Sequence, residues 1–240
     1  KSILSEDEGI SCQLLAEDQR KTIVKTRIIA HGQQVVRLDR ESITAPSDDT
    51  LESLKQTISH SLNDIDGVIL QDYNKGVFTK GLIEWIMDQT RKRSIPVYVD
   101  PKKDHFSFYS GARLFKPNLS EFFTGIDDET DLEIAGESFR SQHGFDLLMV
   151  TQGEKGMSLF SKDKFYQIAT KARAAHDVSG AGDTVISVAS ICFCMSISNN
   201  FLGYFSNLAG TIVCQTSGVI QINKKKLFKE AIKNDLDKYL

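Results

Sequence analysis

Cysteine is scarce in this sequence of 240 residues, and the four that occur form no metal-binding or redox motif. No two of them have the C-x-x-C spacing of zinc sites and thioredoxin-like proteins. Three fall in one apolar stretch, which favours buried, reduced thiols over a disulfide framework. The first residues are polar and acidic, without the apolar run of a signal peptide. Together these absences predict a cytoplasmic protein. The cysteines are Cys12, Cys192, Cys194 and Cys214.

The sequence also lacks an excess of charge of one sign. The 29 Lys and Arg residues are opposed by 32 Asp and Glu residues, which gives a formal net charge of −3. No overall positive field therefore attracts nucleic acid, and we expect no nucleic-acid partner. Hydrophobic residues make up 40% of the chain and charged residues 25%, as in ordinary globular proteins. This composition argues against intrinsic disorder.

A long uninterrupted apolar run is absent as well. The stretch from Thr184 to Asn223 contains no Asp, Glu, Lys or Arg, which calls for a comparison with membrane-spanning helices. Such helices need about 20 mostly apolar residues in a row. Polar and glycine residues interrupt this stretch between Ser196 and Gly210. It is therefore interpreted as two buried helices, and we expect no membrane partner.

The remaining sequence predicts an α/β fold. Residues 22–40 are rich in β-branched residues around a His31-Gly32 turn, a pattern typical of a β-hairpin. From Ser47 onward, short apolar runs alternate with helical patterns, which indicates a mostly parallel sheet covered on both faces. We predict one three-layer domain over residues 1–240, from which the hairpin at 22–40 projects as a lid. Strands are expected at 67–70, 96–99, 112–115, 146–150, 157–160 and 164–168, and helices at 47–62, 79–93, 118–123, 131–143, 181–197, 201–215 and 224–233.

Polar residues follow four of the predicted strands. The strand endings begin at Gln71, Asp100, Lys116 and Thr151, and they contain carboxylates, lysines and glycines. Ligands of open α/β sheets bind outside the carboxyl ends of the strands. Right-handed connections would place all four endings on one edge of the sheet. This edge is the expected site of an anionic ligand handled with a metal ion.

The most informative motif is Asp-Val-Ser-Gly-Ala-Gly-Asp-Thr at residues 177–184. Small residues at a helix start let a ligand approach the unshared N–H groups of Gly180, Ala181 and Gly182, where the helix dipole favours an anion. Asp183 in the first turn could accept a proton from an attacking hydroxyl. The alternative is a helix start with small residues for tight packing. Neither the G-x-x-x-x-G-K-[ST] loop nor the full G-x-G-x-x-G loop is present.

Two further motifs have structural alternatives. Asn118 and Glu121 have the spacing of a helix capping box. Thr151, Gly153 and Gly156 could form only a turn. The five histidines show no metal-ligand spacing, and His176 beside the glycine loop is interpreted as a solvated loop residue.

In combination, these segments resemble the ribokinase-like (PfkB) family of small-molecule kinases. Residues 177–183 resemble that family's second signature, and residues 117–121 and 151–156 match its nucleotide-side motifs in the right order. Within the family, the resemblance is strongest to kinases of D-glycero-D-manno-heptose 7-phosphate, which make a precursor of the lipopolysaccharide core. The segments that carry this closer resemblance are 25–27, 33–39, 72–76, 100–102 and 183–186.

The resemblance implies phosphoryl transfer from ATP, with Mg²⁺, to the anomeric hydroxyl of a sugar phosphate. Asp183 would be the base, and the N–H groups at 180–182 would form the anion hole. The segment Asn118, Leu119, Ser120 and Glu121 would serve the ATP phosphates and Mg²⁺, with Glu121 acting on the metal through water. Residues bordering the nucleotide would be Thr151, Gly153 and Gly156, with Asn207 near the adenine.

The same resemblance implies a substrate site with cations for the sugar's own phosphate. A two-residue hairpin turn would put Arg27 and Arg37 on opposite faces, and a one-residue slip would reunite them. One arginine could instead serve a homodimer contact through the lid, since such flaps often pair in this family. The substrate-binding candidates are Arg27, Arg37, Asp72, Lys75 and Lys102.

The sequence departs from the family pattern in two places. Family members begin with a strand and loop that carry a glycine pair and an acidic residue for the sugar, and no such segment precedes residue 22. We therefore expect an N-terminally incomplete kinase domain. Ser187 stands where close relatives usually have glycine, a small packing change. The H-x-G-H motif of a C-terminal nucleotidyltransferase, found in bifunctional relatives, does not occur in this chain.

Overall fold

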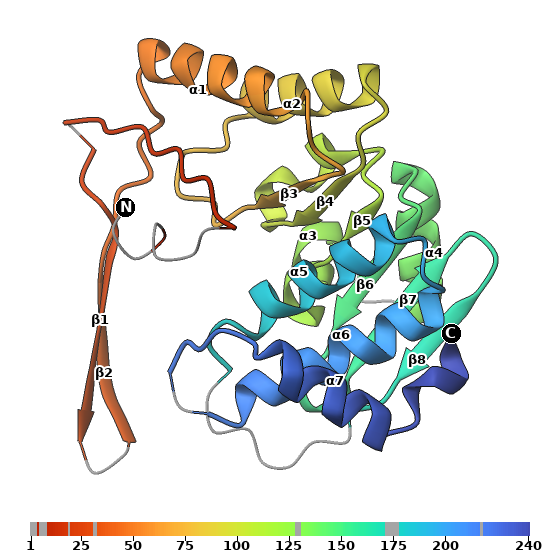
Figure 1. Ribbon diagram of the computed structural model, residues 1–240. Coiled ribbons are helices and arrows are strands. Elements are labelled where there is room, and N and C mark those ends of the chain that lie inside the picture. Colours follow the sequence, from red (N-terminus) through yellow and green to blue (C-terminus); the bar gives the residue numbers. More distant parts are fainter. Residues whose placement is uncertain are drawn as a thin grey trace. The chain divides into compact units, whose positions relative to one another are not determined.

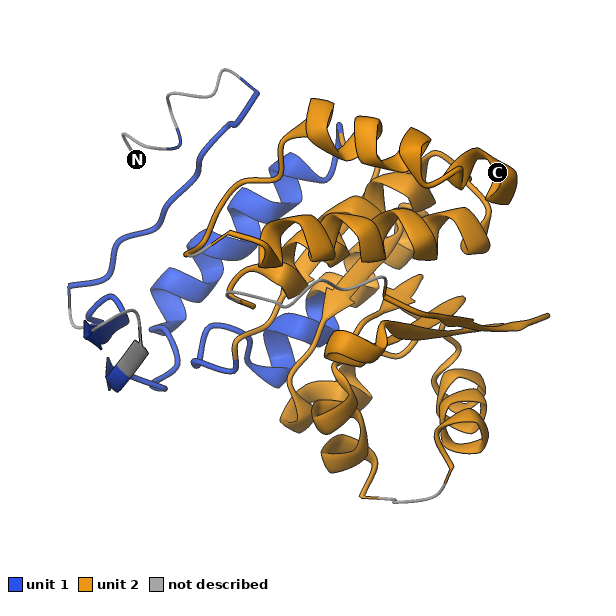
Figure 2. Cartoon of the chain, turned by 90° about the horizontal axis from the view of Figure 1, so that it is seen from below, with its two compact units in different colours: residues 1–64, 74–85 blue, residues 65–73, 86–240 orange. Residues whose placement is uncertain are grey.

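The computed structural model describes residue 4 and residues 9–18, 20–30, 33–127, 131–170, 178–216 and 218–240. The chain forms two compact units, each described by itself (Figure 2). Unit 1 comprises residues 1–64 and 74–85, and unit 2 comprises residues 65–73 and 86–240. The predicted turn at His31-Gly32, as well as His176 and Asp177, lie outside the described residues.

Unit 2 contains a six-stranded sheet in the order β3-β4-β5-β6-β7-β8 (Figure 1). Strands β3 to β6 pair in parallel, and β7 runs antiparallel to both of its neighbours. Four of the six strands are buried almost throughout, as expected for apolar runs that helices cover on both faces. The predicted α/β fold with a mostly parallel sheet is thus confirmed. The strands are β3 (Val68–Gln71), β4 (Val97–Asp100), β5 (Leu114–Phe115), β6 (Leu147–Thr151), β7 (Met157–Ser161) and β8 (Phe165–Ile168).

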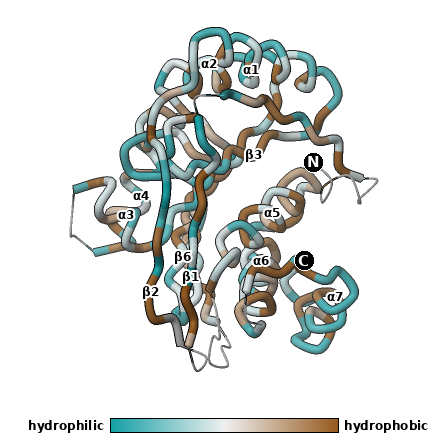
Figure 3. Tube along the Cα trace, turned by 90° about the vertical axis from the view of Figure 1, so that its left-hand side faces the viewer, coloured by the Kyte–Doolittle hydropathy of each residue, from teal (hydrophilic) through white to brown (hydrophobic). Residues whose placement is uncertain are grey.

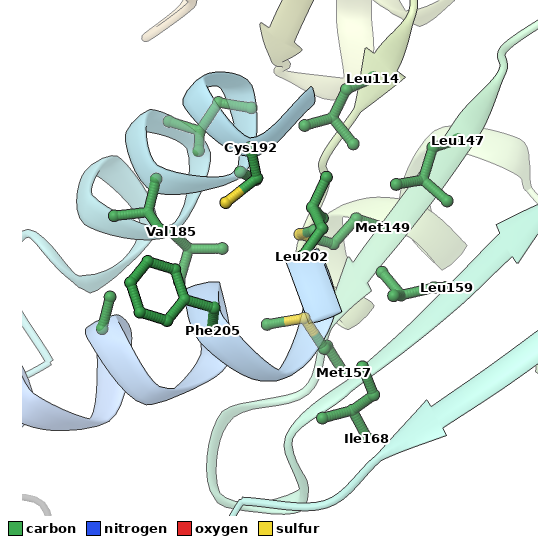
Figure 4. Close-up of a cluster of buried hydrophobic side chains, with 14 of the residues drawn as sticks. Leu114, Leu147, Met149, Met157, Leu159, Ile168, Val185, Cys192, Leu202 and Phe205 are labelled. Atoms are coloured by element: carbon green, nitrogen blue, oxygen red, sulfur yellow. The ribbon is translucent and has the colours of Figure 1, made fainter. Parts of the chain in front are cut away.

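One face of this sheet packs against α5 (Ala181–Cys194) and α6 (Asn199–Cys214), which α7 (Lys224–Lys233) covers in turn. Figure 4 shows Val185 of α5 and Phe205 of α6 in one apolar cluster with Met149 and Leu159 of the sheet. The uncharged stretch that begins at Thr184 therefore forms two core helices, as predicted. None of the helices in the described ranges has the length and apolar character that crossing a bilayer requires.

The opposite face is covered by aromatic side chains. Phe115 of β5 stacks on Phe145 with a centroid distance of 4.5 Å, and it contacts Phe106 and Phe139. Phe106 lies on the 3₁₀ helix η2 (Lys103–Tyr109), and Phe139 lies on α4 (Leu132–His143), which neighbours α3 (Leu119–Ile126). The sequence analysis assigned no helix to the η2 segment. Its short aromatic pattern lacks the 3.6-residue period of an α-helix.

Unit 1 contains α1 (Asp48–Ser61), which starts after Ser47 as predicted, because the Ser47 side chain accepts the N–H of Thr50. The helix α2 (Lys80–Lys92) crosses the division between the units at residues 85 and 86. Strands β1 (Val24–Ala30) and β2 (Gln33–Arg40) form the predicted hairpin as a separate antiparallel sheet.

The register of the hairpin decides between the two predicted placements of Arg27 and Arg37. Ala30 pairs with Gln33, but the register shifts between Ile28 and Ile29, so that Val35 is left over and Arg27 pairs with Arg37. This β-bulge places the two arginines on the same face, not on opposite faces as a regular two-residue hairpin would. Hydrophobic positions occur along both strands, next to hydrophilic ones (Figure 3).

None of the four cysteines lies in a disulfide, as predicted, but they are not all buried. Cys192 lies on the buried face of α5 and belongs to the core, whereas Cys194 is exposed. Cys194 is the last residue of α5, and its Sγ lies 3.1 Å from the hydroxyl group of Tyr98 in β4. Burial raises the pKa of the Cys192 thiol to about 11, so this thiol is chemically inert at neutral pH.

Candidate functional site

The four predicted strand endings are neighbours at one edge of the sheet in unit 2. Gln71 pairs with Asp100, the N–H of Lys116 donates to the Val99 carbonyl oxygen at 2.9 Å, and Asn118 forms a bridge with Thr151. Parallel strands hydrogen-bonded in this way bring their carboxyl ends together. The polar residues that follow each strand thus share a single edge of the sheet.

The glycine loop starts α5 at this edge. Gly180 is the N-cap residue and has φ +78°, a left-handed conformation that glycine adopts without steric cost. The N–H of Ala181 donates to the Val178 carbonyl oxygen at 3.3 Å. The prediction of three unshared amides is therefore wrong for Ala181, whose amide closes the turn before the helix.

Asp183 lies exposed in the first turn of α5. Its Oδ1 accepts a hydrogen bond of 3.2 Å from the hydroxyl group of Tyr73, which follows β3. Burial raises the pKa of Tyr73 to about 12, and the charge of Asp183 adds to this effect. The tyrosine therefore stays a neutral donor at physiological pH. This bond connects the loop to the end of β3.

A buried ion pair lies beneath the glycine loop. Lys116 Nζ is 2.9 Å from Asp100 Oδ2, and Gln71 Nε2 donates to the same oxygen at 3.0 Å. A Cβ atom at Gly182 would lie 3.5 Å from Lys116 Nζ and 3.7 Å from Asp100 Oδ2. The absence of a side chain at Gly182 thus brings the helix start against two charged groups. The sequence analysis placed Lys116 and Asp100 only at strand ends; the signal available was a charge that directly follows an apolar strand.

Asn118 and Glu121 form the capping box of α3. Asn118 Oδ1 accepts the N–H of Glu121 at 2.9 Å, and Glu121 Oε2 accepts the N–H of Asn118 at 3.0 Å. Leu119 and Ser120 form the first turn of the helix between them. Glu121 Oε1 pairs with Lys102, which follows β4. Lys102 is thus paired with the nucleotide-side candidate Glu121.

Thr151 ends β6 and leads into the turn of residues 153–156. Gly153 has φ +59° and Gly156 has φ +95°, and the N–H of Gly156 donates to the Gly153 carbonyl oxygen at 3.0 Å. Both glycines therefore meet a conformational requirement of the turn. Asn207 on α6 accepts the Thr170 hydroxyl at 3.0 Å and donates to the Ala169 carbonyl oxygen at 3.3 Å, so it holds the chain after β8.

Asp72 is 1% exposed. Its Oδ2 accepts the Tyr109 hydroxyl at 2.8 Å and lies 2.6 Å from His105 Nδ1. Burial raises the pKa of Tyr109, and the charge of Asp72 adds to this effect. A carboxylate engaged in this way fixes η2 to the end of β3. The sequence analysis did not identify His105 and Tyr109 because no spacing relates them to Asp72.

The other predicted substrate residues belong to unit 1. Arg27 and Arg37 are cross-strand neighbours in the hairpin, and Arg37 Nη2 is 3.0 Å from Asp39 Oδ2. Lys75 Nζ is 2.9 Å from Glu41 Oε1. The structure brings the two arginines together on one face, and it pairs the lysine with a carboxylate of its own unit.

A divalent cation would find few direct protein ligands. Within the described ranges, no three His, Cys, Asp or Glu side chains gather to form a metal site. Both oxygens of Glu121 already accept protein donors, but a carboxylate has lone pairs for a further partner. Mg²⁺ usually keeps several waters and binds through one or two carboxylates and substrate phosphates. The residues present fit a water-mediated Mg²⁺ contact at Glu121.

The chain resembles known proteins over most of its length. A family model described as pfkB family carbohydrate kinase matches residues 3–226. Proteins named Bifunctional protein HldE from Syntrophotalea carbinolica and Nitratiruptor sp. are 34% identical over 229 residues and 35% identical over 212 residues. These matches cover 92% and 87% of this chain but 46% and 45% of those proteins. The chain thus spans about half the length of the curated relatives it matches.

Solved structures share the fold. Phosphofructokinase-2 from Escherichia coli in its tetrameric inhibited form gives a TM-score of 0.81 at 18% identity, covering 98% of this chain and 77% of that one. Ribokinase from Thermotoga maritima gives 0.58 at 17% identity, covering 73% and 59%. At these identities, the similarity extends to the fold alone.

Proposed function

Because the chain belongs to the pfkB family of carbohydrate kinases, we propose that it transfers a phosphoryl group from ATP to a hydroxyl group of a sugar phosphate. The observation that carries the proposal is the arrangement at the edge of the sheet. There the glycine loop of α5, with Asp183, meets the ends of the strands that lead into Asn118 and Thr151. Positioning and electrostatic stabilisation are most of what phosphoryl transfer requires from a protein.

Asp183 acts as the general base. Its carboxylate accepts the proton of the sugar hydroxyl as that oxygen attacks the terminal phosphorus of ATP, and ADP leaves with the electrons of the broken P–O bond. The N–H groups of Gly180 and Gly182 stabilise the transferred group at the positive end of α5. The N–H of Ala181 joins them by giving up its long bond to Val178.

The nucleotide binds along the ends of β5 and β6. Asn118 and Glu121 serve its phosphates, and Thr151 with the 153–156 turn borders the nucleoside. Mg²⁺, held through water by Glu121, supplies charge neutralisation on the phosphate oxygens when bound. Asn207 lies near the adenine, where it also fixes the chain after β8.

The acceptor is D-glycero-D-manno-heptose 7-phosphate, which receives the group on its anomeric hydroxyl. This choice is supported by the HldE relatives at 34–35% identity. Arg27 and Arg37 are the candidates for the acceptor's own phosphate. Like charges directly opposite each other destabilise a hairpin, and a bound dianion would relieve that repulsion. The product fits lipopolysaccharide core synthesis in the cytoplasm.

An acceptor panel tests this proposal. We expect ADP formation, followed in a coupled assay, with heptose 7-phosphate, and kcat/KM at least roughly 10²-fold lower with fructose 6-phosphate or ribose. Sites built to hydrogen-bond a substrate reject analogues that leave these groups unpaired. Equal rates with fructose 6-phosphate would favour the alternative, a kinase for another sugar phosphate. ATP binding by calorimetry without turnover on any acceptor would identify a nucleotide-binding fragment.

The hairpin lid mediates a homodimer in this proposal. Its pairs Thr26–Leu38 and Ile28–Val36 lie on one face, and Leu38 and Ile28 are 57% and 47% exposed. A two-stranded ribbon is marginally stable without a partner that covers its apolar face.

Replacing Leu38 with Asp is expected to convert the dimer to a monomer, because it puts a charge into that apolar face. Light scattering after gel filtration gives the mass. Lys25→Gln, a change on the opposite face that sets no like charge against its partner Asp39, serves as the control and should remain dimeric. A monomeric wild type, or a dimeric Leu38→Asp variant, contradicts the lid as the interface.

A further inference from the structure

The buried ion pair under the glycine loop calls for an explanation beyond stability. Lys116 and Asp100 are 3% and 6% exposed. Among the described residues, no other lysine is buried to this degree. Burying two charges costs several kcal/mol per ion, and apolar replacements of such pairs are often neutral or stabilising. A buried ion pair is therefore weak evidence for a stabilising role. Its position at the candidate site is a reason to look for a role in binding or catalysis.

The position of the pair indicates which group it can serve. Gly182 lies directly over it, since a Cβ there would be 3.5 Å from Lys116 Nζ. A longer side chain at this position would separate the lysine from any ligand in the loop. The ammonium group has three donors, and Asp100 Oδ2 accepts one of them. The charge thus lies at the start of α5, where the helix dipole also favours an anion.

Asp100 and Gln71 hold this lysine in place. Asp100 Oδ2 accepts from both Lys116 Nζ and Gln71 Nε2, at 2.9 and 3.0 Å. Gln71 and Asp100 are direct neighbours in the parallel ladder of β3 and β4. A donor fixed before the reaction costs no reorganisation when charge develops, which is the basis of electrostatic stabilisation in active sites.

We propose that Lys116 is a further catalytic residue of the anion hole: its ammonium group donates to an oxygen of the transferred phosphoryl group beside Gly182, and Asp100 and Gln71 position it. The inference rests on the proposed phosphoryl transfer, and it adds the Lys116 ammonium group to the residues that stabilise the transferred phosphoryl group. Lys102, which also follows a strand at this edge, is engaged by Glu121. Among the described residues, Lys116 Nζ is the only cationic atom within 4 Å of a Cβ atom placed at Gly182.

The test compares two ligands without measuring turnover. Calorimetry determines the affinity for MgADP alone and for MgADP with aluminium fluoride, a planar anion that stands for the transferred group. Lys116→Met keeps the length of the side chain and removes the charge. We expect it to bind MgADP within threefold of the wild type and the fluoride complex roughly 10²-fold more weakly, the usual effect of losing one such donor. Lys103→Met, at an exposed position on η2, is the matched control and should leave both affinities unchanged.

The other possible results of the calorimetry also decide whether Lys116 acts in the anion hole. If Lys116→Met binds the fluoride complex like the wild type, the inference is wrong and the proposed function stands. Lys116→Met could instead lose stability together with both affinities, because it leaves the charge of Asp100 buried and unpaired. In that case we measure the double variant Asp100→Asn/Lys116→Met, which leaves no unpaired buried charge. A folded double variant with restored fluoride binding overturns the inference, and one with weak fluoride binding supports it. A wild type that binds no ADP overturns the proposed function and the inference with it.

Discussion

Replacing Asp183 with Asn is expected to lower kcat for phosphoryl transfer roughly 10³-fold or more while the protein stays folded. The substitution keeps the shape of the side chain and removes the oxygen that accepts the proton, and a positioned base contributes about 10² to 10⁴ in rate. Asp183 is exposed and on the surface of α5, so its replacement disturbs no core contact. Steady-state ADP formation with saturating acceptor measures the effect.

Two variants separate loss of the base from indirect effects. Tyr73→Phe removes the hydroxyl that donates to Asp183 and leaves the ring, so we expect a loss of roughly tenfold or less, the value of one hydrogen bond. Asp163→Asn makes the same chemical change in the exposed turn between β7 and β8 and should have no effect. ATP affinity should be unchanged in all three. An Asp183→Asn enzyme within tenfold of the wild-type rate would exclude this residue as the base.

Replacing Gly156 with Ala is expected to destabilise unit 2 strongly, although the change adds only one methyl group. Gly156 has φ +95° and ψ −126°, a region that residues with a Cβ rarely enter. The added Cβ would also overlap the Ile168 carbonyl oxygen and lie 2.8 Å from the Thr170 amide nitrogen. Strain and overlap together are expected to cost about 4 kcal/mol or more, which lowers the melting temperature by about 10 °C or prevents folding.

Gly144→Ala provides the matched control for this prediction. Gly144 ends α4 with φ +66°, and nothing lies within 4 Å of the position of its Cβ. The control thus keeps the unfavourable φ and omits the overlap, and it should cost only about 1 kcal/mol. Thermal unfolding followed by circular dichroism compares the two. Equal melting temperatures for both variants would show that the turn relaxes around the new methyl group, contrary to the prediction.

The sequence contains enough information for the elements of the fold because its local signals agree with one another. Ser47 is a good N-cap before an amphipathic helix, and the observed helix begins where the cap predicts. The runs that form β3 to β6 are apolar up to their last residues, and the sheet is covered on both faces. The η2 helix was missed because residues 103–109 form a short 3₁₀ segment that is held by tertiary contacts of Phe106 and Tyr109.

The parts of the candidate site that could be predicted are those formed by residues adjacent in the sequence. The loop at 180–183 and the capping box at 118–121 are contiguous motifs that can be recognised in the sequence. The pair of Lys116 and Asp100 joins two different strands, and the distance between their charges depends on the order β4-β5, which no local pattern specifies. The register of Arg27 and Arg37 depends on a bulge at Val35, a residue with ordinary strand propensity.

That bulge also bears on how the hairpin avoids aggregation. An apolar two-stranded ribbon with free edges is a template on which further chains can add into fibres. A bulge breaks the regular row of edge hydrogen-bonding groups and increases the local twist, so a second flat strand finds no continuous partner. The leftover residue in β2 thus protects against fibrous assembly, and it does so without a proline or any loss of length in the ribbon.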